Sequence, residues 1–158
     1  GLKFFNVYGP NELHKGDMMS IVAKNFQTSA EGGEVRLFKS HHPDYEDGGQ
    51  LRDFVYVEDC VEAIMWLLDH SSATGLYNVG SGAARSFKDL IQAAYRAAGK
   101  PPKLKYVDMP EALRGKYQYF TQADLTRLKS AGYARDTTSL EDGVREYIQR
   151  YLLRGENR

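Results

Sequence analysis

The chain opens on an apolar run, residues 2–8, that stops at Gly9-Pro10. Gly-Pro is a turn signal, so the run predicts a buried strand whose last side chains reach the edge of a sheet. A buried strand needs neighbours, yet this one begins directly after Gly1, which is not a start methionine. We therefore expect the chain to be part of a longer protein.

Short apolar runs and helical patterns alternate after this strand, with Gly or Pro where many of them end. We expect strands at 35–38, 53–57, 75–79 and 104–107, and helices at 17–30, 58–69, 87–98, 121–130 and 138–152. Residues 40–50 are polar and are expected to form a loop. No repeat or long linker divides the 158 residues, which favours one mixed α/β domain.

Particular residues predict where these helices begin and which face they bury. Three capping pairs mark helix starts, namely Ser86 with Asp89, Thr121 with Asp124, and Thr138 with Glu141. The expected buried faces are Val61, Ile64 and Leu68 in the second helix, and Leu140, Val144, Ile148 and Leu152 in the last.

Charge and cysteine content exclude several classes of protein. Lys plus Arg is 21 and Asp plus Glu is 21, so the formal net charge is zero and no nucleic-acid partner is expected. The single cysteine, Cys60, allows no internal disulfide. No apolar run is long enough to cross a bilayer and no signal peptide is visible, so we expect a cytoplasmic protein without membrane contact.

Three motifs offer groups for chemistry. Asn6 lies near the end of the first strand, where open α/β sheets bind ligands, and its amide can bind a sugar hydroxyl or a cofactor amide. Lys15 is expected beside a helix N-terminus, a position that suits a lysine base. Arg52 follows the glycines at 48–49 and can grip a diphosphate bidentately.

Each motif also has an alternative interpretation. Asn6 could bond backbone at a strand end, and Lys15 could be a solvated loop lysine. Arg52 could form an ion pair with Asp53 or Asp59. Tyr117, which could close over a sugar or a base, could equally be a packed core residue.

Two absences matter as well. No glycine-rich dinucleotide fingerprint and no Tyr-x-x-x-Lys pair occurs in the 158 residues. The pair His41-His42 has acidic neighbours in one loop, but we expect no metal site there.

The order of the motifs resembles the nucleotide-sugar members of the extended short-chain dehydrogenase/reductase family over nearly the whole chain. The matching blocks are Phe5-Asn6-Val7-Tyr8-Gly9-Pro10, Arg52-Asp53-Phe54-Val55-Tyr56-Val57 and Tyr77-Asn78-Val79-Gly80-Ser81-Gly82. The resemblance implies the carboxy-terminal substrate-binding part of this Rossmann-type fold: the last sheet strand or strands plus a small mixed α/β subdomain. Residues 1–158 would be that single domain, without the amino-terminal dinucleotide-binding domain.

Two further stretches, His14-Lys15-Gly16-Asp17-Met18 and residues 114–125, are similar to family members that epimerise an ADP-linked heptose. This resemblance implies an isomerase that uses NADP to oxidise a heptose carbon and re-reduce it from the other face, for the inner core of lipopolysaccharide. It also implies a homo-oligomer. Without the missing domain, this chain is expected to be inactive and to bind NADP weakly. Another sugar epimerase or dehydratase of the family, or a non-catalytic sugar-nucleotide binding or assembly module, remain the alternatives.

The same resemblance assigns roles to individual residues. Lys15 would be a catalytic base that also contacts the cofactor, and Val7 would lie beside the nicotinamide. The substrate-binding set would be Asn6, Asp17, Lys24, Phe38, Lys39, Ser40, His41, Arg52 and Tyr117. Asp17 stands where other members carry a small Ser, Lys24 stands where they carry a His, and the loop 41–51 is longer than in some of them.

Overall fold

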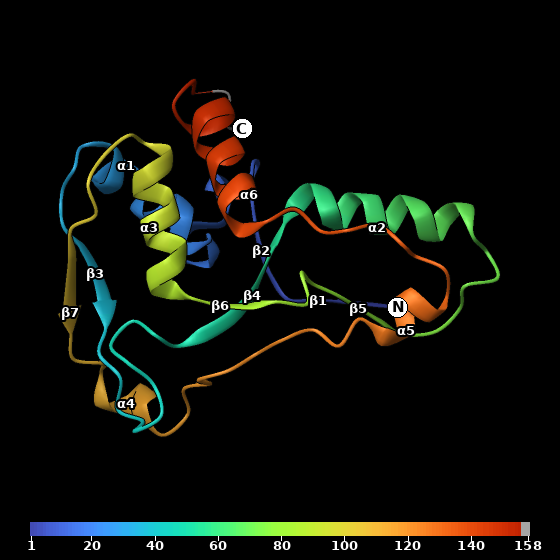
Figure 1. Ribbon diagram of the computed structural model, residues 1–158, viewed down its shortest axis with the longest axis horizontal. Helices are drawn as coiled ribbons and strands as arrows, with labels where there is room; N and C mark the ends of the chain where they lie inside the picture. The colour runs from blue at the N-terminus through green and yellow to red at the C-terminus, as the bar shows by residue number, and fades with distance from the viewer. Residues whose placement is uncertain (156–158) are drawn as a thin grey trace.

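The computed structural model describes residues 1–155 and has the expected α/β class (Figure 1). Its strands are β1 (Leu2–Phe4), β2 (Asn6–Tyr8), β3 (Val35–Phe38), β4 (Leu51–Tyr56), β5 (Tyr77–Val79), β6 (Ala84–Ser86) and β7 (Leu104–Val107). Its helices are α1 (Ile21–Ala30), α2 (Val57–Asp69), α3 (Phe87–Ala97), α4 (Glu111–Arg114), α5 (Thr126–Ser130) and α6 (Leu140–Glu146), with a 3-10 helix η1 (Leu13–Met18) and a π-helix η2 (Tyr147–Leu152).

The strands form three small sheets. β1 pairs in parallel with β5, and β3 pairs in parallel with β7. β4 joins β2 in parallel and β6 in antiparallel orientation. In Figure 1, α2, α5, β1 and β5 occupy one end of the molecule, and β3, β7, α1 and α3 occupy the other. β4 runs between the two ends and therefore connects them.

The predicted strand 2–8 is interrupted at Phe5, which corrects the expectation of one buried strand. The Phe5 amide donates to the Val79 carbonyl at 3.0 Å, but the Val7 amide turns back to the Phe5 carbonyl at 2.9 Å. The chain therefore leaves the sheet of β5 and continues in the sheet of β4. Within residues 1–155, β1 pairs with β5 alone, and Phe4 is 43% exposed rather than buried.

Three helix starts differ from the prediction, two of them because a distant residue binds the expected N-cap residue. α1 begins at Ile21 rather than at residue 17, because Ser20 is its N-cap and accepts from the Ala23 amide. The Thr138 hydroxyl donates a hydrogen bond to Asp59, and Ser139 caps α6 instead. Thr121 pairs with the backbone of Leu51, and α5 begins only at Thr126. The capping box of Ser86 and Asp89 at α3 is confirmed.

The buried face of α2 is also not the predicted one. Cys60 and Ala63 are buried and pack in a cluster with strands β4 and β5, whereas Val61 and Leu68 are 46% and 70% exposed. The face is rotated by one residue because Asp59 points inward to Thr138. In the last helix, Leu140, Val144 and Ile148 are buried as predicted, and Leu152 packs against the same cluster.

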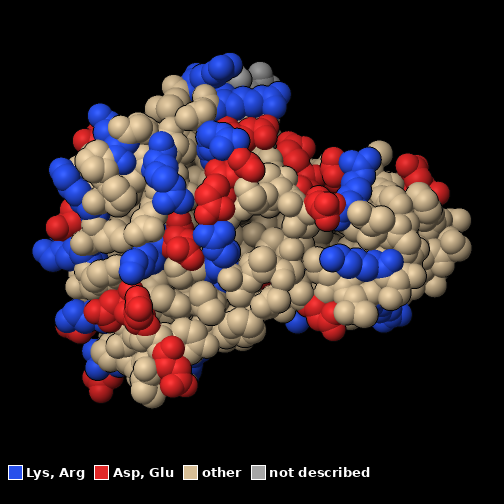
Figure 2. Space-filling view, viewed as in Figure 1, with Lys and Arg blue, Asp and Glu red and all other residues tan. Residues whose placement is uncertain are grey.

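Charge is mixed over the surface, and no single sign dominates the face shown in Figure 2. Within residues 1–155, no helix combines the length and apolarity needed to cross a bilayer.

Candidate functional site

A cleft with two neighbouring compartments lies where β2 and β4 meet α1 and α3. The larger compartment, about 450 Å³, is bordered by residues 5–8 and 18–21, together with three apolar side chains of β4 and α3. The smaller, about 180 Å³, lies against β3 and is bordered by Phe38, Gln50 and Tyr117. Ile21 and Phe87 border both compartments, so the two adjoin each other.

β4 carries Arg52, which is only 9% exposed. Arg52 borders neither compartment itself, but it packs against Phe87 and Tyr117, which do. Its guanidinium carbon lies 5.7 Å from the ring centre of Phe87 and 5.2 Å from that of Tyr117. Its Nη1 donates to the Leu51 carbonyl at 2.8 Å. Burial lowers the pKa of the Arg52 guanidinium from its ordinary value, and burial likewise raises the pKa of the Tyr117 hydroxyl.

The alternative that Arg52 pairs with Asp53 or Asp59 is wrong. Neighbouring residues of a strand point to opposite faces, and Asp53 accepts hydrogen bonds from Ser81, Gly82 and Ala123 instead. Asp59 accepts from the backbone and the hydroxyl of Thr138. No carboxylate in residues 1–155 forms an ion pair with Arg52. A buried cation with aromatic neighbours and no counter-charge is suited to bind an anion.

Asn6 and Val7 lie on β2 and line the larger compartment. Asn6 stands beside Phe54 of β4 in register, and it is exposed. Its amide forms no hydrogen bond within the described residues, so the structure does not support the alternative of a strand-end Asn bonded to backbone. The amide is available to both donors and acceptors in the cleft.

Lys15 lies on η1 at the rim of the larger compartment. Its side chain is exposed and does not border either compartment, although Met18 and Met19 of the same segment do. The helix start expected beside Lys15 lies at Ile21 instead, so the positive end of α1 does not adjoin it. The structure thus places the Lys15 segment, but not the Lys15 ammonium, against the cleft.

Residues 1–80 of this chain match the NAD dependent epimerase/dehydratase family, which is half of its 158 residues. The chain belongs to this family.

Relatives within the family are epimerases. The ADP-L-glycero-D-manno-heptose-6-epimerase of Nitratidesulfovibrio vulgaris (strain Hildenborough) is 56% identical over 151 residues, covering 96% of this chain and 47% of the relative. The enzyme of the same name from Fusobacterium nucleatum is 47% identical, covering 99% and 49%. These matches confirm the resemblance seen in the motifs. The chain spans about half the length of the curated relatives it matches.

Solved structures of family members share the fold. The Helicobacter pylori ADP-L-glycero-D-manno-heptose-6-epimerase superposes with a TM-score of 0.75 at 31% identity, over 95% of this chain and 43% of that one. The Thermus thermophilus UDP-glucose 4-epimerase, a complex with NAD, gives a TM-score of 0.74 at 29% identity, over 93% and 44%.

The remaining predicted ligands of this epimerase-family chain lie around the rim. Phe38 and Tyr117 both border the small compartment and contact each other edge to face, with ring centres 6.4 Å apart and planes at 88°. Lys24 Nζ donates to the Asp17 carbonyl at 2.5 Å, and both residues are exposed. These two residues do not border the compartments.

The segment 39–41 is held by contacts of its own and also stays outside the two compartments. Lys39 forms an ion pair with Asp108 at 3.2 Å. The Ser40 amide donates to Asp47 at 2.8 Å, and the His41 amide donates to the Tyr119 hydroxyl at 3.0 Å.

Sequence reasoning misses two residues of the site. Phe87 stacks under Arg52 and separates the compartments, and its position directly after the capping residue Ser86 is the signal that the sequence offers. Gln50 belongs to the stretch predicted as a polar loop. It is instead 1% exposed, and its amide donates to the carbonyls of Phe38 and Lys39 at 3.4 and 3.3 Å.

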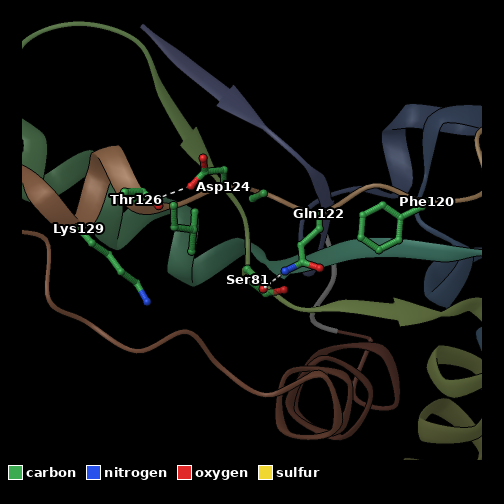
Figure 3. A pocket seen from close by; sticks show the side chains of 9 residues that line it. Ser81, Phe120, Gln122, Asp124, Thr126 and Lys129 are labelled. Atoms are coloured by element: carbon green, nitrogen blue, oxygen red, sulfur yellow. Dashed lines mark hydrogen bonds between the residues drawn. The ribbon is translucent and has the colours of Figure 1, made fainter.

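A separate cavity of about 490 Å³ lies between the turn after β5 and the start of α5 (Figure 3). Ser81, Gln122 and Lys129 line it, and it shares no residue with the cleft. No predicted ligand lies there. Within residues 1–155, no three His, Cys, Asp or Glu side chains gather to hold a metal ion.

Replacing Arg52 by methionine is expected to weaken the binding of ADP by about 10- to 100-fold, roughly 1.4–2.8 kcal/mol. Methionine retains much of the apolar contact with Phe87 and Tyr117 but removes the charge that the cleft offers to an anion. Calorimetric titration with ADP measures the change. Arg145→Met is the matched control, since Arg145 forms an exposed ion pair with Asp142 on α6. Equal ADP affinity in both variants would exclude Arg52 as the anion site.

Proposed function

We propose that this chain is the substrate-binding half of an NADP-dependent epimerase that inverts C6 of the heptose in ADP-D-glycero-D-manno-heptose. The observation that carries the proposal is the buried Arg52 guanidinium, which contacts aromatic rings and forms no ion pair with a carboxylate of residues 1–155. A pyrophosphate supplies the charge that this position lacks. The 56% identity to the Nitratidesulfovibrio vulgaris enzyme supports the choice of sugar nucleotide.

The two compartments suggest how the substrate lies. The smaller one, bordered by the ring pair Phe38 and Tyr117, has apolar walls that suit the adenosine. Arg52 stands over Tyr117 and grips the pyrophosphate next to it. The sugar then extends into the larger compartment, where the Asn6 amide binds a hydroxyl.

Inversion of one carbon requires that hydride leaves and returns on opposite faces. The bound dinucleotide supplies the hydride acceptor and donor. This chain contributes Lys15 as the base on one face of the reacting carbon. Lys15 lies on η1 shortly before Met18, which borders the compartment, and a kink at Gly16 separates the two residues. The flexible Lys15 side chain reaches the sugar by turning over the rim.

Few residues of this chain are suited to hold the dinucleotide itself. Val7 offers an apolar surface in the larger compartment for the nicotinamide ring. The 158 residues contain no glycine-rich phosphate-binding loop. We assign the rest of the binding site for NADP to a dinucleotide-binding half that precedes residue 1 in the full-length protein.

Two surfaces support such a missing half. β1 pairs with β5 on one side and with no strand of residues 1–155 on the other. On α2, Val61, Met65 and Leu68 are 46%, 53% and 70% exposed and share one face at helical spacing. An unpaired strand edge and an exposed apolar stripe are both surfaces that another part of a protein can cover. The relatives are about twice as long as this chain.

The test is turnover by the full-length protein with NADP and either of two sugar nucleotides, ADP-D-glycero-D-manno-heptose or UDP-glucose. We expect the C6 epimer of the ADP-linked heptose, detected by proton NMR, and no conversion of UDP-glucose. Conversion of UDP-glucose alone would assign another epimerase activity of the family. Tight binding of the ADP-linked heptose without turnover would assign a non-catalytic binding module.

A further inference from the structure

Glu12 is a buried carboxylate for which the proposed function has no role. It is 3% exposed and forms no ion pair with a basic residue of the described chain. Its two oxygens accept the Ser20 amide at 2.6 Å, the Ser20 hydroxyl at 2.7 Å and the Gly9 amide at 3.4 Å. A buried carboxylate that loses its hydrogen-bond donors is costly in free energy, and these three donors therefore hold the Glu12 side chain in one position.

These hydrogen bonds close the loop that carries Lys15. Gly9 is the residue after β2 and Ser20 is the residue before α1, so Glu12 ties the two ends of the loop together. The Glu12 carbonyl also accepts the Lys15 amide at 3.0 Å. The backbone of the catalytic candidate and both ends of its loop therefore depend on one residue.

The backbone of this loop adopts conformations that few residue types allow. Gly9 has φ +145°, and a Cβ there would collide with Val57. Asn11 and Gly16 have φ values of +66° and +53°, which L side chains seldom adopt. A loop that passes through such conformations needs an anchor to keep them, and Glu12 provides it.

Ser20 links Glu12 to the first turn of α1. Its hydroxyl donates to Glu12 and at the same time accepts the Ala23 amide at 3.2 Å, which fixes the first turn of the helix. A carboxylate near the N-terminus of a helix is also favoured by the helix dipole. α1 contributes Ile21 to both compartments, so the anchor aligns Lys15 with the wall of the cleft.

We propose that Glu12 is a positioning residue, which with Ser20 sets the place of Lys15 at the mouth of the cleft. This inference rests on the proposed function, in which Lys15 is the base. A plain capping role would lower stability without affecting the chemical step. A positioning role lowers kcat and leaves the KM for the sugar nucleotide unchanged, because Arg52, Phe38 and Tyr117 lie on other elements.

The experiment measures kcat, KM and Tm of the full-length protein carrying Glu12→Gln or Ser20→Ala. Glutamine has the same shape but places an NH2 group against one of the donors, and alanine removes the hydroxyl. We expect kcat to fall by about 10- to 100-fold in each variant, as small misplacements of a catalytic group do. KM is expected to stay within about twofold in Glu12→Gln, since Glu12 borders neither compartment. Ser20 borders the larger compartment, so the KM comparison is made on Glu12→Gln alone. Ser20→Thr, which retains the hydroxyl, is expected to restore kcat.

The matched control is Ser139→Ala. Ser139 caps α6 in the same way, accepting the Asp142 amide at 3.1 Å, but lies on an element outside the cleft. The Tm of Ser139→Ala is expected to fall by about as much as that of Ser20→Ala, and its kcat is expected to be unchanged. Equal kcat losses in Ser139→Ala and Ser20→Ala would overturn the proposal. Lys15→Met separates the two failures: an active Lys15→Met refutes the proposed base, whereas an inactive Lys15→Met beside a fully active Glu12→Gln refutes only the positioning role.

Discussion

Replacing Lys15 by methionine in the full-length protein is expected to reduce epimerisation by about 10²- to 10⁴-fold, the range that general acid–base catalysis contributes. Methionine is similar in length and removes only the ammonium group. Because the Lys15 side chain is exposed and the fold does not depend on packing around it, Tm is expected to be unchanged. Quenched-flow or NMR assays of the product measure the rate, and fluorescence titration measures NADP affinity, which should be retained.

The control is Lys129→Met. Lys129 lines the separate cavity shown in Figure 3 and has no part in the cleft, so its replacement should leave turnover intact. A Lys15→Met protein that turns over at the normal rate would remove Lys15 from the mechanism. A loss of activity in Lys129→Met instead would point to the separate cavity as the site of reaction.

Local patterns predict those elements whose determinants lie within the element. β3 and β7 begin and end where expected, because each is a short run with apolar residues at both ends, flanked by polar residues and preceded by Gly33 or Pro102. The capping box before α3 is also visible in the sequence, since its two partners are three residues apart. The same holds for the stripe Leu140, Val144 and Ile148, which follows the helical repeat.

The failures share a cause, which is a partner outside the local pattern and in most cases far away in sequence. The break at Phe5 depends on β4 and β5, which follow it by about 50 and 70 residues in the chain. Thr138 is a good N-cap by residue type, but Asp59 binds it. The start of α1 differs from the prediction because Ser20 is selected by Glu12, and nothing in the local pattern marks that pair.

For the site, residue types were predictable and their partners were not. The motif around Arg52 indicates an anion ligand, but the sequence also allows an ion pair with Asp53. The structure excludes that pair because Asp53 is occupied by the turn at 81–82 and by Ala123. Likewise, the chain has eleven tyrosines, and the sequence does not show that Tyr117 is the one that packs against Phe38 and Arg52.

Replacing Asp53 by alanine is expected to destabilise the protein severely, lowering the free energy of unfolding by about 3–5 kcal/mol. Asp53 is fully buried and accepts four hydrogen bonds, from the Ser81 amide (2.6 Å), the Ser81 hydroxyl (2.7 Å), the Gly82 amide (2.9 Å) and the Ala123 amide (2.9 Å). Its removal leaves three backbone donors without an acceptor, each costing about 1–3 kcal/mol. Urea denaturation followed by circular dichroism measures the loss.

The matched control is Asp124→Ala, because Asp124 is an exposed carboxylate that accepts a single amide, that of Thr126 at 2.9 Å. Water replaces an exposed acceptor, so this variant is expected to unfold at nearly the same urea concentration as the unaltered protein. Equal losses in the two variants would mean that water satisfies the donors around Asp53.

Asp53→Asn tests the independence of Arg52 at the same time. Asparagine retains one acceptor oxygen but turns an NH2 group toward donors, so a smaller loss of about 1–3 kcal/mol is expected. Because Arg52 and Asp53 point to opposite faces of β4, the variant should bind ADP with unchanged affinity. A gain in ADP affinity would show that Asp53 had been neutralising Arg52, and the proposed pyrophosphate site would lose its basis.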